Sequence, residues 1–104
     1  MAVKLLVLKN NIMLRINIPS NGPSNISFAT FDNYDFPKPP NGMDSEVNND
    51  VILLFDDEQE AVDYARELKR LAFEIDDERS AQKKAANEVA TAIESDEFVR
   101  EYLG

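Results

Sequence analysis

The residues of this sequence with the clearest capacity for chemistry are clustered carboxylates. Asp56, Asp57 and Glu58 directly follow the apolar run Val51–Phe55. Carboxylates alone can bind Ca²⁺ or Mg²⁺, and a pair of them can hydrolyse a glycosidic bond. Neither this cluster nor the acids at 76–78 surround the central Gly of an EF-hand loop. We therefore predict no metal site, no cofactor and no catalytic residue.

The segment 51–58, an apolar strand that ends in two Asp and a Glu, resembles the opening strand of response-regulator receiver domains. In that family the acids hold Mg²⁺ beside a phosphorylated Asp at the end of a later strand, and a Lys follows on another strand. Residues 59–104 are typical of helices and offer neither strand. We therefore interpret the acids as the N-terminal caps of a helix, where carboxylates favour the positive end of the helix dipole.

Several classes of active site are excluded by composition, because the chain contains no His and no Cys. A Ser-His-Asp triad, a His general base, a thiolate nucleophile and a disulfide all require these residues. Gly occurs only at positions 22, 42 and 104, so no phosphate-binding glycine loop can be formed. We expect a protein that is not an enzyme and that acts by contact.

Charge is distributed unevenly along the chain, whose formal net charge is −9. Residues 1–50 carry four Lys and Arg against five acids, whereas residues 51–104 carry seven against fifteen. Such a field repels nucleic-acid phosphates and anionic lipids and attracts cations. We predict a basic protein partner, with no direct binding to nucleic acid or membrane; the alternative is that the acids serve only solubility.

The N-terminal run Met1–Leu8 is apolar but is interrupted by Lys9 and lacks a small-residue cleavage site. No run in the chain approaches the roughly 18–20 apolar residues that span a bilayer. We interpret this run as a strand and predict a cytoplasmic protein.

The first half of the chain predicts strands. The alternation of apolar and polar residues over 12–18 indicates a half-buried strand, paired in a hairpin with residues 3–9 through Asn10-Asn11. A third strand is expected at 26–31, followed by a long aromatic and proline-rich loop over 32–50. Residues 51–55 are apolar at every position, which is typical of a buried strand.

The second half predicts helices over about 56–75 and 78–93, and a short one that opens at Ser95-Asp96-Glu97. We expect one α+β domain over 1–104, with a three- to four-stranded, mainly antiparallel sheet packed on two or three helices. The runs 3–8 and 51–55 are apolar on both faces, which suggests that a second subunit covers the sheet as a homodimer.

Candidate partner-binding residues are exposed aromatics and helical acids. They are Tyr34 and Phe36 in the loop, Glu60, Asp63 and Glu67 on the first long helix, and Phe98 and Tyr102 one turn apart in the last helix. The alternative for the loop and C-terminal rings is that they close the core of the protein itself.

These features together favour a non-enzymatic protein-binding module, such as a small regulator, an immunity protein or a phage-type inhibitor. It would bind a basic protein through the acidic helices and the aromatic loop, with affinity that falls as salt rises. One alternative is a DNA mimic that inhibits a nucleic-acid-binding protein. Another is a binder of nucleotides or metabolites, with the aromatic loop over the sheet.

Overall fold

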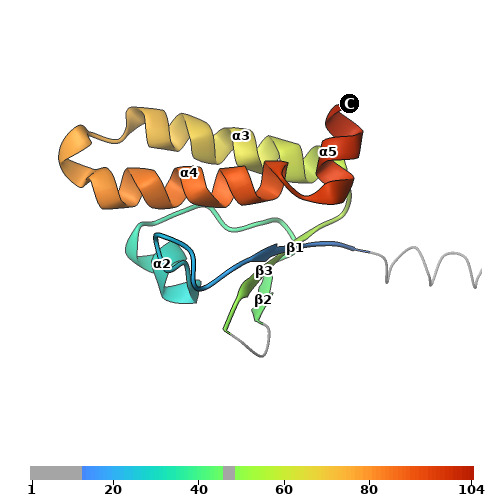
Figure 1. Cartoon of the computed structure of the whole chain (residues 1–104), viewed down its shortest axis with the longest axis horizontal. Helices are drawn as coiled ribbons and strands as arrows, with labels where there is room; N and C mark the ends of the chain where they lie inside the picture. Colours follow the sequence, from blue (N-terminus) through green and yellow to red (C-terminus); the bar gives the residue numbers. More distant parts are fainter. Residues whose placement is uncertain (1–12, 46–48) are drawn as a thin grey trace, which may run out of the picture.

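The chain folds as a small antiparallel sheet under a layer of helices. The computed structural model describes residues 13–45 and 49–104. The elements are β1 (Leu14–Ile18), α2 (Phe28–Asn33), β2 (Met43–Ser45), β3 (Val51–Phe55), α3 (Glu58–Glu74), η1 (Asp77–Arg79), α4 (Ser80–Glu94) and α5 (Glu97–Leu103). Helices α3 and α4 lie antiparallel on one side of the sheet, and α5 lies beside the start of α3 (Figure 1). The predicted α+β class is confirmed.

The sheet has the order β1-β3-β2, and both strand pairs are antiparallel. The central strand is β3, as its fully apolar sequence suggests, and its register with β1 places Leu14 opposite Phe55 and Ile18 opposite Val51. The hairpin partner expected at 3–9 lies outside the described residues. Among the described residues, strand β1 pairs with β3, which lies more than thirty residues later in the sequence.

Alternation along the strands divides the sheet into two unlike faces. The inward face carries Ile16, Ile18, Val51, Leu53 and Phe55, all of which are buried in the core. The outward face carries the exposed polar side chains of β1 and β2 beside Ile52 and Leu54 of β3. These polar side chains include Arg15 and Asp44, whose charged groups lie 3.9 Å apart. The outward face is therefore polar at its margins and apolar only along its centre.

Small residues let the two long helices pack closely. The buried faces of α3 and α4 contain six alanines, and these surround the larger Leu68, Val89 and Ile93. All nine side chains are no more than 1% exposed. Helix α4 therefore depends on burial as well as on its intrinsic propensity.

Acidic caps begin two of the helices, as the sequence predicts. Asp57 is the N-cap of α3, where its Oδ1 accepts a hydrogen bond from Glu60 N at 2.9 Å. Asp96 is the N-cap of α5 and accepts from the backbone N–H groups of Phe98 and Val99. Val99 is fully buried, so this cap fixes the point at which α5 packs against the other helices.

The third strand predicted at 26–31 is wrong, because the segment forms helix α2. Thr30 Oγ1 accepts a hydrogen bond from Ser27 N, so the third residue of the helix satisfies the N–H of its cap. Ile26 and Phe31 are both buried, whereas Phe28 is 41% exposed. The alternation of these residues resembles a strand, but the local capping chemistry and the burial of Phe31 favour a helical turn.

A Schellman motif ends α2 and turns the chain back on itself. Asp35 adopts a left-handed conformation with φ 55°, while Phe36 N donates to Phe31 O and Asp35 N to Asp32 O. The rings of Phe31 and Phe36 meet edge to face, with centroids 5.8 Å apart. The aromatic segment therefore folds into the core.

The long loop predicted over 32–50 contains a strand, β2, and is attached to the helices in its described part. The Tyr64 hydroxyl of α3 donates to Pro37 O, and Gln82 Nε2 of α4 donates to Tyr34 O. Asn41 Nδ2 donates to the carboxylates of Asp56 and Glu60. These contacts hold the loop along one side of the helical layer.

None of the helices in the described ranges is sufficiently long and apolar to cross a bilayer.

Candidate functional site

The aromatic loop does not present its rings for recognition. Phe36 is only 3% exposed and belongs to the core, so its expected contact with a partner is corrected to a packing role. Tyr34 is half-buried and packs against Phe36 with ring centroids 5.6 Å apart. The structure thus places these rings as the alternative interpretation described them, closing the core of the protein itself.

The three candidate acids of α3 differ in how much of each carboxylate is free. Glu60 is half-buried, and its Oε1 accepts hydrogen bonds from Asn41 Nδ2 at 3.1 Å and Asp56 N at 2.9 Å. Asp63 is exposed and accepts from Gln59 Nε2 at 2.8 Å. Glu67 is exposed, and its charge contributes to the raised pKa of Tyr64, which burial mainly causes. Glu60 therefore serves the fold.

The exposed face of α3 is mixed in charge. Arg66, Lys69 and Arg70 are exposed along the same helix as Asp63 and Glu67. Lys69 Nζ also lies 2.6 Å from Glu94 Oε1 of α4, which joins the two helices. The middle of the helical layer is consequently not a continuous acidic surface.

Helix α5 carries the largest group of exposed apolar side chains in the described part of the chain. Phe98 is 59% exposed, and Tyr102 and Leu103 are each 49% exposed. The Tyr102 hydroxyl donates to Gln59 Oε1 in the first turn of α3, and Gln59 in turn donates to Asp63. These hydrogen bonds hold the apolar face of α5 beside the start of α3.

Acids gather at the same end of the molecule. Four carboxylates lie in or just before the first turn of α3 and three lie at or in α5, so seven of the fifteen acids in residues 51–104 meet where these helices lie side by side (Figure 1). We call this region the α5-end surface. It comprises Asp56, Asp57, Glu58, Glu60, Asp96, Glu97 and Glu101 with the apolar Phe98, Tyr102 and Leu103.

A groove of about 510 Å³ opens within this surface, where β1 begins and β3 ends. Met13, Leu14 and Phe98 provide its apolar lining, and the acids at 56–58 lie along it together with Arg15. We call it the Leu14–Phe98 groove. It exists because the strand register sets Leu14 opposite Phe55, so the chain leaves the sheet beside Leu14 and enters α3 through the three acids.

The three acids of the groove differ in the hydrogen bonds that they form within the protein. Asp57 caps α3, and Asp56 Oδ1 accepts from Asn41 Nδ2 at 3.0 Å. The carboxylate of Glu58, which is half-buried, forms no hydrogen bond or ion pair with another residue of the described ranges. Within the described ranges, Glu58 and the second oxygens of Asp56 and Asp57 are thus acceptors in this groove that receive no hydrogen bond.

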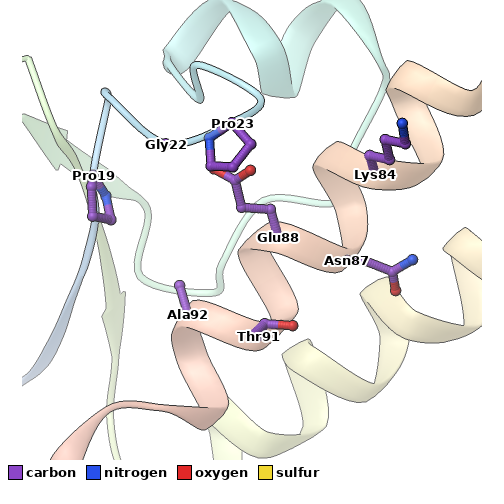
Figure 2. A pocket seen from close by; sticks show the side chains of 8 residues that line it. All are labelled: Pro19, Gly22, Pro23, Lys84, Asn87, Glu88, Thr91 and Ala92. Carbon is purple, nitrogen blue, oxygen red and sulfur yellow. The ribbon is translucent and has the colours of Figure 1, made fainter.

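A second, shallower groove of about 520 Å³ lies between the turn at 19–24 and α4. Figure 2 shows Pro19 and Pro23 facing this helix, with Glu88 pointing toward the turn. Glu88 Oε1 accepts a hydrogen bond from Ser24 N at 2.9 Å. The carboxylate that lines this groove is therefore committed to holding the turn.

Within the described residues, no three carboxylates are close enough together to hold a metal ion. Comparison with known proteins adds no assignment: no protein-family model matches this chain, and no curated protein or solved structure matches it either.

Sequence reasoning identified Phe98 and Tyr102 but missed Leu14, Glu58 and Leu103 as parts of the same surface. Leu14 appears in the sequence only as one apolar residue of a strand, and Glu58 only as a helix-cap acid. A local signal existed for Leu103, which directly follows Tyr102 at the end of α5. No local pattern connects Leu14 with Phe98, because they meet only through the sheet register.

Proposed function

We propose that this protein is a binding module that recognises a basic region of another protein through the α5-end surface. The observation that carries the proposal is the coincidence of exposed Phe98, Tyr102 and Leu103 with seven carboxylates at one end of the molecule. Protein interfaces commonly combine a central group of large apolar side chains with a charged rim. The acids steer a cationic partner, and the apolar group slows its release.

The distribution of charge favours this proposal over DNA mimicry along the helices. A mimic needs carboxylates spaced like phosphates with few cations between them, whereas Arg66, Lys69 and Arg70 interrupt the exposed face of α3. We therefore expect the acidic end, and not the acidic row at Asp63 and Glu67, to make the contact.

Self-association through the outward face of the sheet has weaker support. Ile52 is only 4% exposed, so a second subunit would bury little further apolar area there. Arg15, Asn17 and Asp44 around it are exposed and polar. We do not base the function on a homodimer.

The proposal can be tested by retention of host proteins on the immobilised full chain. Two variants each remove four charges from opposite ends of the helical layer. The near-end variant is D56N/E58Q/E97Q/E101Q, and the far-end control is E74Q/D76N/D77N/E78Q. We expect a basic protein to be retained by the wild type and the control but not by the near-end variant.

Retention should also respond to salt. At about 0.5 M salt the screening length falls to a few ångströms, so the partner should be released from the wild-type protein. Equal retention by the near-end variant and the far-end control would contradict the proposal. So would a retained partner whose binding is unchanged between low and high salt.

A further inference from the structure

The Leu14–Phe98 groove combines an apolar lining with unused acceptors along one side. Phe98 on α5 and Leu14 on β1 both line it, and Glu58 lies along it at the first residue of α3. Its volume of about 510 Å³ lies within the range of about 300–1,000 Å³ that is usual for ligand pockets. A groove of this size admits a large side chain together with part of the backbone that carries it.

The charges along the groove determine which kind of ligand suits it. Asp57 caps α3 through one oxygen. Glu58 and one oxygen each of Asp56 and Asp57 have no hydrogen-bond donor in the described part of the chain. The cation that lines the groove, Arg15, lies 3.9 Å from Asp44 across the sheet. A guanidinium or ammonium group would satisfy the free acceptors, whereas a phosphate or carboxylate would be repelled.

We propose that the groove binds a short partner segment in which one large apolar side chain is flanked by Arg or Lys. The apolar side chain lies between Leu14 and Phe98, and the flanking cation pairs with Glu58 and Asp56. This inference rests on the proposed function and adds the motif that is recognised. It explains why Phe98 remains 59% exposed in the folded chain.

The test uses ¹⁵N-labelled full-length protein and twelve-residue probe peptides of Gly and Ser that carry one Phe between two pairs of Arg. We expect saturable NMR shifts that cluster around Leu14, residues 56–58 and Phe98. Two matched peptides separate the contributions, one with Phe replaced by Ser and one with every Arg replaced by Glu. The first should bind roughly tenfold more weakly, as expected for loss of a central anchor, and the second should not bind.

Matched protein variants assign the contacts. Phe98→Ala should weaken binding of the Phe–Arg peptide by about tenfold, whereas Phe73→Ala should leave the affinity for this peptide unchanged. Phe73 is 86% exposed at the other end of α3, so it controls for loss of an exposed ring. Glu58→Gln should weaken binding severalfold, and Glu67→Gln, which removes the same charge from the same helix, should have less effect.

Three results would overturn the inference. The first is equal binding of the Phe and Ser peptides, which would leave the acidic end as a charge-based partner site without a groove motif. The second is an affinity that Phe98→Ala does not change. The third is a shift of the Phe98 signals caused by Lys4→Glu/Lys9→Glu without peptide, because the groove would then hold the apolar and basic segment 4–9 of this chain. The proposed function is tested separately, by whether the near-end variant fails to retain the host protein that the wild type and the far-end control retain.

Discussion

The carboxylate of Glu88 lies directly against Gly22. A Cβ atom at Gly22 would stand 2.4 Å from Glu88 Oε2, while Oε1 of the same carboxylate accepts the hydrogen bond from Ser24 N. Glu88 is also four residues after Lys84 on α4, yet it turns toward the loop, as Figure 2 shows. A glycine is therefore needed at position 22 because any larger side chain would collide with the Glu88 carboxylate.

Gly22→Ala should destabilise the protein through Glu88. The side chain can swing away, so we expect a loss of about 1 kcal/mol, the usual contribution of one hydrogen bond. In a Glu88→Ala background the same substitution should have little effect or be slightly stabilising. Urea unfolding of the four proteins in this double-mutant cycle measures the coupling, and additive effects would contradict the steric explanation.

Phe36→Ala should remove part of the core. Because Phe36 is 3% exposed and packs on Phe31, we expect the free energy of unfolding to fall by about 3–5 kcal/mol. Phe73→Ala, which removes a ring that is 86% exposed, should change it by less than about 0.5 kcal/mol. Similar chemical-unfolding midpoints for the two variants would contradict the burial of Phe36 in the core.

Tyr64 should make the fold sensitive to alkali. Burial, helped by the nearby Glu67 carboxylate, raises the pKa of its phenol above the ordinary value of 10.0. The folded state therefore holds this proton more tightly than the unfolded state. The resulting stabilisation is complete below about pH 10 and is lost as the pH rises above it.

Tyr64→Phe tests this pH dependence. At pH 7 the variant should be less stable by about 1 kcal/mol, because the hydrogen bond to Pro37 O is lost. Above pH 10 the difference from wild type should narrow, since the variant has no buried phenol to ionise. Thermal unfolding from pH 7 to 11 measures this difference in stability between the wild type and the variant. Tyr102→Phe, at an exposed tyrosine, is the control. A constant difference across this range would contradict the raised pKa.

Asp96→Ala should loosen α5 and with it the α5-end surface. The carboxylate accepts from two backbone N–H groups of the first turn, so its loss should cost about 1 kcal/mol. Hydrogen exchange should become faster at Phe98 and Val99 while amides in the middle of α4 change little. Ser95→Ala is the adjacent control, and equal exchange in both variants would show that the cap does not hold α5.

Much of the secondary structure follows from local patterns. The period of Ala61, Ala65, Leu68 and Ala72 predicts α3, and Asp96 predicts the start of α5 because its side chain can cap the first turn. The apolar run Val51–Phe55 predicts a buried strand because all five of its side chains are apolar. These signals lie within one element and need no knowledge of its neighbours.

The sequence by itself determined the strand at Val51–Phe55, the long helices of the second half with their acidic first turns, and the absence of His and Cys chemistry. The tertiary structure decided that Phe36 turns into the core, that β1 pairs with β3, and that Leu14 therefore meets Phe98 beside Glu58. The physical reason is that a local pattern shows which side chains share a face. What covers that face depends on contacts between residues far apart in the chain.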